Sequence, residues 1–213
     1  KHESEYNLSL LDSLLPEQTK QPEYNFKKSS PEPWWKEFSK ELNCPNYGIV
    51  HPGSGDSAPN LNAEQYILII RLLLENTGWT VLLTGISEEE KLIRELAADF
   101  PEERVKNAAG RFSLVQLFSI IRNSSLLVTS STGPLHMANA VGTPLLGFFC
   151  PAKPHTPDRW GPYDQQKWVV TPNLNGPETC QLKKCPYGGC LQKLTELEIK
   201  EIVCNQRLKE LNT

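Results

Sequence analysis

Apolar runs and segments of helical periodicity alternate along most of this 213-residue chain. We assign strands to the apolar runs at residues 47–52, 79–84, 126–129 and 144–149, and shorter strands to 104–108 and 168–171. The apolar runs lack polar alternation, as expected for strands buried on both faces of a parallel sheet. Between them, apolar residues recur at the spacing of one buried helix face. The pattern predicts an α/β fold with a doubly wound parallel sheet.

Capping signals mark where the predicted helices begin. A hydroxyl or amide side chain followed three residues later by Glu or Gln can cap a helix reciprocally. Four pairs fit this pattern: Asn62 with Gln65, Ser87 with Glu90, Ser113 with Gln116, and Thr195 with Glu198. A helix therefore follows each of the first three predicted strands, and the last pair begins a helix over 196–211.

The first 44 residues differ in character from the rest. Residues 4–15 have leucines at helical spacing and predict a short amphipathic helix. Prolines then interrupt a polar segment, before a second helix over 33–42 that carries Trp34, Trp35 and Phe38. We interpret these aromatic side chains as packing residues rather than ligand contacts. We divide the chain into a linker with short helices at 1–44 and a Rossmann-like domain at 45–213.

A strand, a turn and a helix start follow one another at residues 126–144. The predicted strand is followed by hydroxyl residues and Gly133, and then by Pro134, which is well tolerated at the first position of a helix. A helix start has unpaired N–H groups and the positive end of the helix dipole. The turn is thus suited to a phosphate, with His136 in reach. From these residues alone, an ordinary turn beside a buried histidine is an equally good interpretation.

Two further turns follow predicted strands. Gly53, Ser54 and Gly55 come after the first strand, where backbone N–H groups can approach a phosphate closely. Thr84 and Gly85 end the second strand, and the acids at 88–90 follow. An acid at this place can hold ribose hydroxyls. The alternative is that these acids only compensate the helix dipole.

Composition excludes some classes of function. The formal net charge of −3, with basic residues dispersed among acids, argues against a nucleic-acid partner. No run is long enough to cross a bilayer. Three of the six cysteines, Cys180, Cys185 and Cys190, form a cluster that admits a zinc site, but its spacing favours packed or redox-active thiols in a reducing compartment.

The segment from Ser131 to Pro144, with 145–151 and 159–163 after it, resembles the donor-side motif of the lipopolysaccharide heptosyltransferases. These are glycosyltransferases of the GT-B type, with two Rossmann-like domains. The resemblance implies that this chain is the C-terminal, donor-binding half, in which the segment from Ser131 to His136 lies against the diphosphate and sugar of ADP-heptose. It also implies transfer of heptose to the lipopolysaccharide inner core.

The resemblance implies where the remaining parts of such an enzyme lie. The catalytic base belongs to the N-terminal domain, which we expect to be absent from this chain, so we expect the isolated chain to be inactive. The expected partners are the nucleotide-sugar donor, the lipopolysaccharide acceptor and the chain's own N-terminal domain. We expect no metal or other cofactor, and a cytoplasmic location with peripheral contact at the inner membrane. The expected donor-binding residues are Gly53, Ser54, Gly55, Thr84, Gly85, Glu89, Ser131, Thr132, Gly133 and His136.

Two departures from the family pattern keep other functions open. Most members have Asp where this chain has Ser131, and a neutral hydroxyl would hold sugar hydroxyls less strongly. Many members carry a basic residue a few positions after the first turn, whereas this chain has no Lys or Arg between His51 and Arg71. Helix dipoles, backbone N–H groups, or another residue such as Lys153 or Arg159 would have to neutralise the donor phosphates. The alternatives are a transferase or 2-epimerase that uses another nucleotide sugar, and a non-catalytic binding module.

Overall fold

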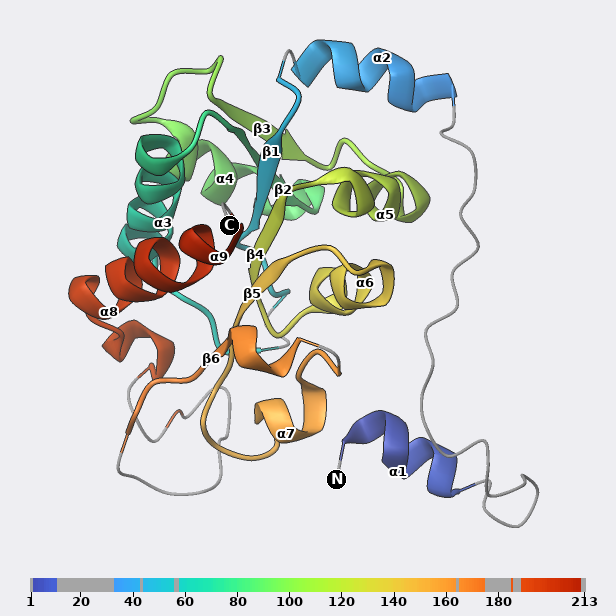
Figure 1. Ribbon diagram of the computed structural model, residues 1–213, viewed down its shortest axis with the longest axis vertical. Helices are drawn as coiled ribbons and strands as arrows, with labels where there is room; N and C mark the ends of the chain where they lie inside the picture. Colours follow the sequence, from blue (N-terminus) through green and yellow to red (C-terminus); the bar gives the residue numbers. More distant parts are fainter. Residues whose placement is uncertain are drawn as a thin grey trace.

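The computed structural model describes residues 2–10, 33–42, 44–55, 58–163, 165–174, 185 and 189–211. Within these residues, six parallel strands form one sheet in the order β3-β2-β1-β4-β5-β6 (Figure 1). The strands are β1 (Tyr47–His51), β2 (Thr80–Gly85), β3 (Val105–Ala109), β4 (Leu126–Ser130), β5 (Leu145–Phe148) and β6 (Val169–Val170). The strand order reverses between β1 and β4, which confirms the predicted doubly wound sheet.

Helices cover both faces of the sheet (Figure 1). One face is covered by α3 (Ala63–Asn76), α4 (Glu90–Ala97), α8 (Glu196–Lys200), a π-helical stretch (Glu201–Leu208) and α9 (Lys209–Leu211). The other face is covered by α5 (Leu114–Asn123) and α6 (Gly133–Val141). No helix among the described residues is long and apolar enough to span a membrane.

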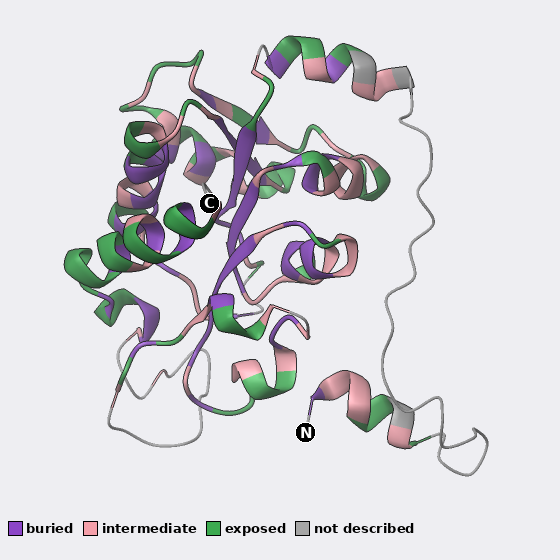
Figure 2. Cartoon of the chain, viewed as in Figure 1, coloured by how far each residue is buried: buried purple, intermediate pink, exposed green. Residues whose placement is uncertain are grey.

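Neighbouring residues of each central strand point into two different cores. Val50 and Val128 pack with α3 and α4, whereas Ile49 and Leu127 pack with α5 and α6. All four side chains are fully buried, and Figure 2 shows the central strands as a continuous buried layer. Because both faces are covered, these strands need no polar positions, which is why the sequence shows uninterrupted apolar runs.

Three of the four predicted capping pairs are confirmed. In α3, for example, the Gln65 N–H donates to Asn62 Oδ1 at 2.9 Å, and the Asn62 N–H donates to Gln65 Oε1 at the same distance. The same arrangement begins α5 and α8. The predicted pair of Ser87 and Glu90 is wrong. The Ile86 N–H donates to the Glu89 carboxylate instead, at 3.0 Å, so the chain makes a 3₁₀ turn (Ser87–Glu89) before α4 begins.

The two N-terminal helices lie at opposite ends of the molecule (Figure 1). Helix α2 (Pro33–Leu42) has the predicted bounds, and Phe38 packs edge-on against Phe112. The half-buried Trp34 and Trp35 pack against the core on this face, which confirms their predicted packing role. Helix α1 (Glu3–Ser9) covers part of the predicted helix at 4–15, of which 11–15 lie outside the described residues. It lies beside the short helix α7 (Pro157–Trp160), which forms part of the loop predicted at 151–163.

Candidate functional site

The candidate site lies where β1 and β4 end at the same edge of the sheet. His51, the last residue of β1, is in register with Thr129 in β4. The turn after β1 therefore lies next to the turn after β4. Ligands of doubly wound sheets bind in this crevice, because the chain leaves the two strands in opposite directions there.

Asn60 connects the two turns. Its Oδ1 accepts hydrogen bonds from Ser130 Oγ at 2.6 Å and from Tyr66 Oη at 2.5 Å, and its Nδ2 donates to the Pro52 carbonyl. Ser130 and Tyr66 are buried, and burial raises the pKa of Tyr66, so its hydroxyl stays protonated. The sequence did not predict a role for these three side chains, because no local pattern indicates that Asn60 contacts a residue of β4.

Hydroxyl groups also connect the turn after β4 to β1. Thr129 Oγ1 donates to the His51 carbonyl at 3.1 Å and lies 3.0 Å from Thr132 Oγ1. The Thr132 side chain makes no capping bond to α6, although it is the N-cap residue. The half-buried Ser131 hydroxyl has no hydrogen bond among the described residues. The start of α6 therefore has no side-chain acceptor from its own N-cap residue.

A cleft of about 450 Å³, which we call the α6 cleft, opens at this helix start. It is lined by Ser131, Thr132, Gly133, His136, Pro154, His155, Arg159 and Trp160. It brings together the four residues predicted from the 126–144 segment. Among the lining residues, Arg159 carries a permanent positive charge, and none of them is an acid.

Both histidines of the α6 cleft favour the neutral form. Burial, together with the nearby His2, lowers the pKa of His136. Burial and the nearby Arg159 lower the pKa of His155. Each imidazole can therefore offer one hydrogen-bond donor and one acceptor at neutral pH without adding charge.

A second cleft of about 360 Å³, which we call the β2 cleft, lies at the ends of β2 and β3. It is lined by His51, Thr84, Gly85, Ile86, Ser87, Glu88, Gly110, Phe112, Leu114 and Leu117. His51 Nδ1 lies 2.9 Å from Thr84 Oγ1, and both side chains are buried. Burial lowers the pKa of His51 to about 4, although the nearby Glu89 acts in the opposite direction. The Thr84 hydroxyl, predicted as a donor-binding group, therefore already has a hydrogen-bond partner within the protein.

The Glu89 carboxylate lies beside Gly53 and Gly85, which belong to the two predicted glycine turns. A Cβ atom added to Gly53 would lie 2.0 Å from Glu89 Oε2, and one added to Gly85 would lie 2.7 Å from the same atom. Glycine at both positions leaves the space that the carboxylate fills. Gly55 adopts a left-handed φ of +52°, which glycine adopts without strain. The structure therefore brings Glu89 together with Gly53 and Gly85.

Cys185 and Cys190 of the predicted cluster lie in the core that α3 covers. The Cys190 thiol is hydrogen-bonded with Cys150, a residue outside the predicted cluster, and this bond and burial raise the pKa of Cys190. Cys185 lies nearby, while Cys180 lies outside the described residues. Among the side chains that the structure describes, no group of three or more His, Cys, Asp or Glu could hold a metal ion.

Comparison with known protein families matches residues 5–191 to glycosyltransferase family 9 (heptosyltransferase). A Haemophilus influenzae protein, provisionally described as a glycosyltransferase, is 32% identical over 171 residues, which are 76% of this chain and 49% of that protein. Lipooligosaccharide heptosyltransferase 2 of the same organism is 33% identical over 142 residues, covering 65% of this chain and 39% of the relative. The chain spans half or less of the length of these relatives.

The fold also has relatives among solved structures. The structure of Escherichia coli ADP-heptose lipopolysaccharide heptosyltransferase II matches with a TM-score of 0.66 and 22% identity, over 92% of this chain and 56% of that one. At this identity the likeness establishes the fold alone. It is the Rossmann-like fold that the sequence analysis expected.

Proposed function

This chain belongs to glycosyltransferase family 9, the heptosyltransferases, and on that premise we propose that it is the donor-binding half of an enzyme that transfers heptose from ADP-heptose to the lipopolysaccharide inner core. The family match and the names of its relatives support the sugar and the acceptor. The observation that carries the proposal is the α6 cleft, where a helix start, two neutral histidines and Arg159 surround one space.

In this proposal, the α6 cleft holds the diphosphate of the donor. The start of α6 offers backbone N–H groups and the positive end of the helix dipole. A Cβ atom at Gly133 would meet nothing within 4 Å, so the protein leaves open space above this turn. Arg159 can form charge-assisted hydrogen bonds to phosphate oxygens. It thereby replaces the basic residue that the family pattern places after the first turn.

The β2 cleft then holds the nucleoside. The Glu89 carboxylate, between Gly53 and Gly85, is available to accept hydrogen bonds from ribose hydroxyls. Phe112 and Leu117 give the cleft an apolar wall against which a base can stack. In this proposal, the predicted turn at Gly53, Ser54 and Gly55, which approaches Glu89 at Gly53, lies along the path from ribose to diphosphate.

The chemical role of this half is to stabilise the leaving nucleoside diphosphate. As the glycosidic bond breaks, negative charge grows on the diphosphate, and the preorganised donors of α6 and Arg159 oppose that charge. His136 contributes a neutral hydrogen bond in this cleft. We assign no catalytic base to this chain. The base, the acceptor site and contact with the membrane at its cytoplasmic face belong to the whole protein in this proposal.

Ser131 favours a second candidate, a related enzyme that uses another nucleotide sugar. Its hydroxyl is half-buried at the α6 cleft and can make only neutral hydrogen bonds. A carboxylate at this position would hold two sugar hydroxyls more strongly. The donor sugar therefore depends on what Ser131 selects, and comparison with Ser131→Asp tests this.

Calorimetric titration with ADP, UDP, GDP and ADP-heptose tests the proposal. We expect selective binding of ADP and ADP-heptose, and binding weakened about tenfold in His136→Ala, because one hydrogen bond to a charged group contributes about 1.5–3 kcal/mol. Asn123→Ala is the matched control, since this exposed residue lies at the far end of α5. Equal, weak responses to all four ligands would contradict the proposal and favour a non-catalytic module.

A further inference from the structure

The first turn of α1 packs against the loop that forms one wall of the α6 cleft. His2 is buried, and its Nδ1 accepts a hydrogen bond from the Ser4 N–H at 3.2 Å. Its Nε2 therefore carries the proton and donates to the Gly161 carbonyl at 2.9 Å. The His2 ring also lies edge-on to Tyr163, with centroids 5.3 Å apart. Helix α1 is thus attached to this loop by a buried, directional contact.

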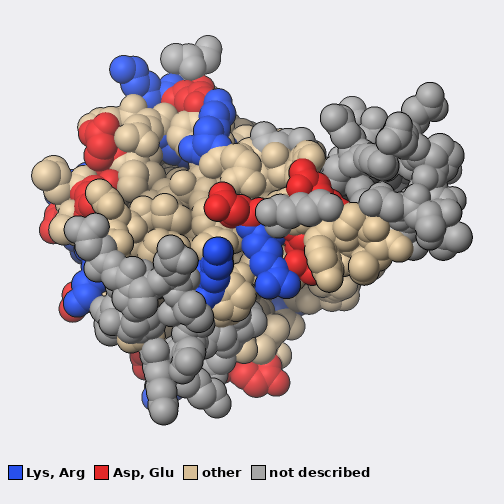
Figure 3. Space-filling model, turned by 90° about the horizontal axis from the view of Figure 1, so that it is seen from below, with Lys and Arg blue, Asp and Glu red and all other residues tan. Residues whose placement is uncertain are grey.

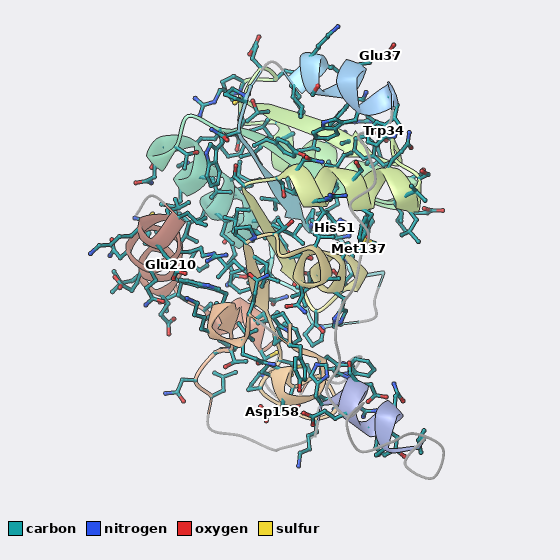
Figure 4. All side chains as sticks on the ribbon, turned by 45° about the vertical axis from the view of Figure 1, so that its right-hand side comes forward. Trp34, Glu37, His51, Met137, Asp158 and Glu210 are labelled. Atoms are coloured by element: carbon teal, nitrogen blue, oxygen red, sulfur yellow. The ribbon has the colours of Figure 1, made fainter. Side chains whose placement is uncertain are left out.

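Glu3 extends this contact to the cleft itself. Arg159 Nε donates to Glu3 Oε2 at 2.8 Å. The Arg159 guanidinium also lies over the Trp160 ring, 5.1 Å from its centroid. Figure 4 shows the same neighbourhood, with Asp158 of α7 close to α1. The guanidinium is therefore restrained at one edge and on one face.

The terminal nitrogens of Arg159 remain available. A carboxylate that competes with a ligand would be expected to take both terminal nitrogens in a bidentate pair. Here the hydrogen bond to Glu3 uses Nε, and among the described residues no hydrogen bond engages the terminal nitrogens. Because Arg159 lines the α6 cleft, the ion pair leaves the two nitrogens that a phosphate would engage free to face a ligand.

We propose that Glu3 is a positioning residue for donor binding: it holds Arg159 through Nε so that the terminal nitrogens face the diphosphate. This inference rests on the proposed function of the α6 cleft. It makes α1, a helix from the linker region, part of the donor site. It also explains how a site without a basic residue after its first turn obtains an oriented cation. Figure 3 shows basic and acidic side chains intermixed on this side of the molecule, so a general positive field does not supply that cation.

A double-mutant cycle tests the inference, with ADP and adenosine as probes. Calorimetry on the full chain compares wild type, Glu3→Gln, Arg159→Gln and the double variant. We expect Arg159→Gln to weaken ADP binding at least tenfold and Glu3→Gln to weaken it about three- to tenfold. In the Arg159→Gln background, Glu3→Gln should add less than twofold. Adenosine affinity should not change in any variant, because adenosine lacks the phosphates that Arg159 contacts.

Glu196→Gln is the matched control, since Glu196 forms an exposed ion pair with Lys200 on α8, remote from the cleft. Equal or tighter ADP binding by Glu3→Gln would overturn the inference and indicate that Glu3 competes with phosphate. A Glu3→Gln loss that persists without Arg159, or that extends to adenosine, would also overturn it and indicate a general structural effect. Absence of ADP binding by the wild-type chain would instead contradict the proposed function on which the inference rests.

Discussion

The two clefts at the carboxyl edge of the sheet are constructed differently. At the β2 cleft, side chains are already held by the protein: His51 Nδ1 lies 2.9 Å from Thr84 Oγ1, and Glu89, beside the cleft, accepts the Ile86 N–H. In the α6 cleft, no described residue bonds the Ser131 hydroxyl, and the cation, Arg159 of α7, is paired with Glu3. Under the proposed function, the nucleoside would be recognised by preformed shape and the diphosphate by charge. The following predictions test that contrast.

The largest expected effect concerns the pH dependence of stability through His51. Burial lowers its pKa from 6.5 to about 4, so the folded state resists protonation. Above pH 6.5 both states are neutral and the contribution is constant. As the pH falls from 6.5 to about 4, only the unfolded state binds the proton, and the unfolding free energy drops by about 3 kcal/mol. Urea unfolding at pH 7 and pH 4.5 should show this drop, reduced in His51→Asn. An equally large drop in unfolding free energy in His51→Asn would show that His51 is not the group responsible.

Asn60→Ala tests the connection between the turns after β1 and β4. The substitution removes the acceptor that the buried Ser130 and Tyr66 hydroxyls share; these lie 3.3 Å apart, so one can donate to the other, and the remaining unsatisfied donor costs about 1–3 kcal/mol. We expect a loss of about 2 kcal/mol in urea unfolding, and weaker binding of both adenosine and ADP. Asn76→Ala is the control, because its side chain caps a carbonyl within α3, away from the site. A loss of stability without any effect on binding would separate Asn60 from the site.

Gly53→Ala tests the preformed shape of the β2 cleft. The new Cβ would collide with the Glu89 carboxylate, which is the flexible end of a side chain and can rotate away. The expected cost in stability is therefore small, about 1 kcal/mol for the hydrogen bond to the Ile86 N–H. Adenosine binding should fall about tenfold, as in Glu89→Gln. Adenosine binding at the wild-type level would disprove a ribose role for Glu89.

Gly133→Ala should have the smallest effect on the protein itself. Nothing lies within 4 Å of the added Cβ, so we expect the unfolding free energy to change by less than about 0.5 kcal/mol. If the diphosphate lies against this turn, ADP binding should weaken while adenosine binding does not change. Equal affinity for ADP before and after the change would place the phosphates elsewhere.

Features marked by adjacent residues were predicted from the sequence, whereas features that depend on contacts between distant residues were not. Strands such as β1 and β4, with their turns, were predicted because a buried parallel strand and a helix start are marked by adjacent residues. Asn60 was missed because its partners are on β4 and α3. The wrong capping pair at Ser87 shows a related limit. Glu89 competes for the same turn, and the sequence does not show which acid folds back.

The candidate site follows the same rule. The motif from Ser131 to His136 was predicted together and lines one cleft. Thr84 was predicted as a ligand contact, yet its hydroxyl bonds to His51. The role of α1 was not predicted, because its contact with Arg159 joins residues 156 positions apart. The assignment of the candidate-site residues to donor binding stays a prediction, which titration tests.

The packing of Glu89 on Gly53 also limits how this protein can evolve. A side chain at position 53 is tolerated only if residue 89 becomes shorter or turns away, and a long acid at 89 keeps its present position only while 53 stays a glycine. The two positions should therefore covary among homologous sequences, although they are 36 residues apart by their numbers in this chain. Selection from a library randomised at both positions should recover paired changes far more often than single ones.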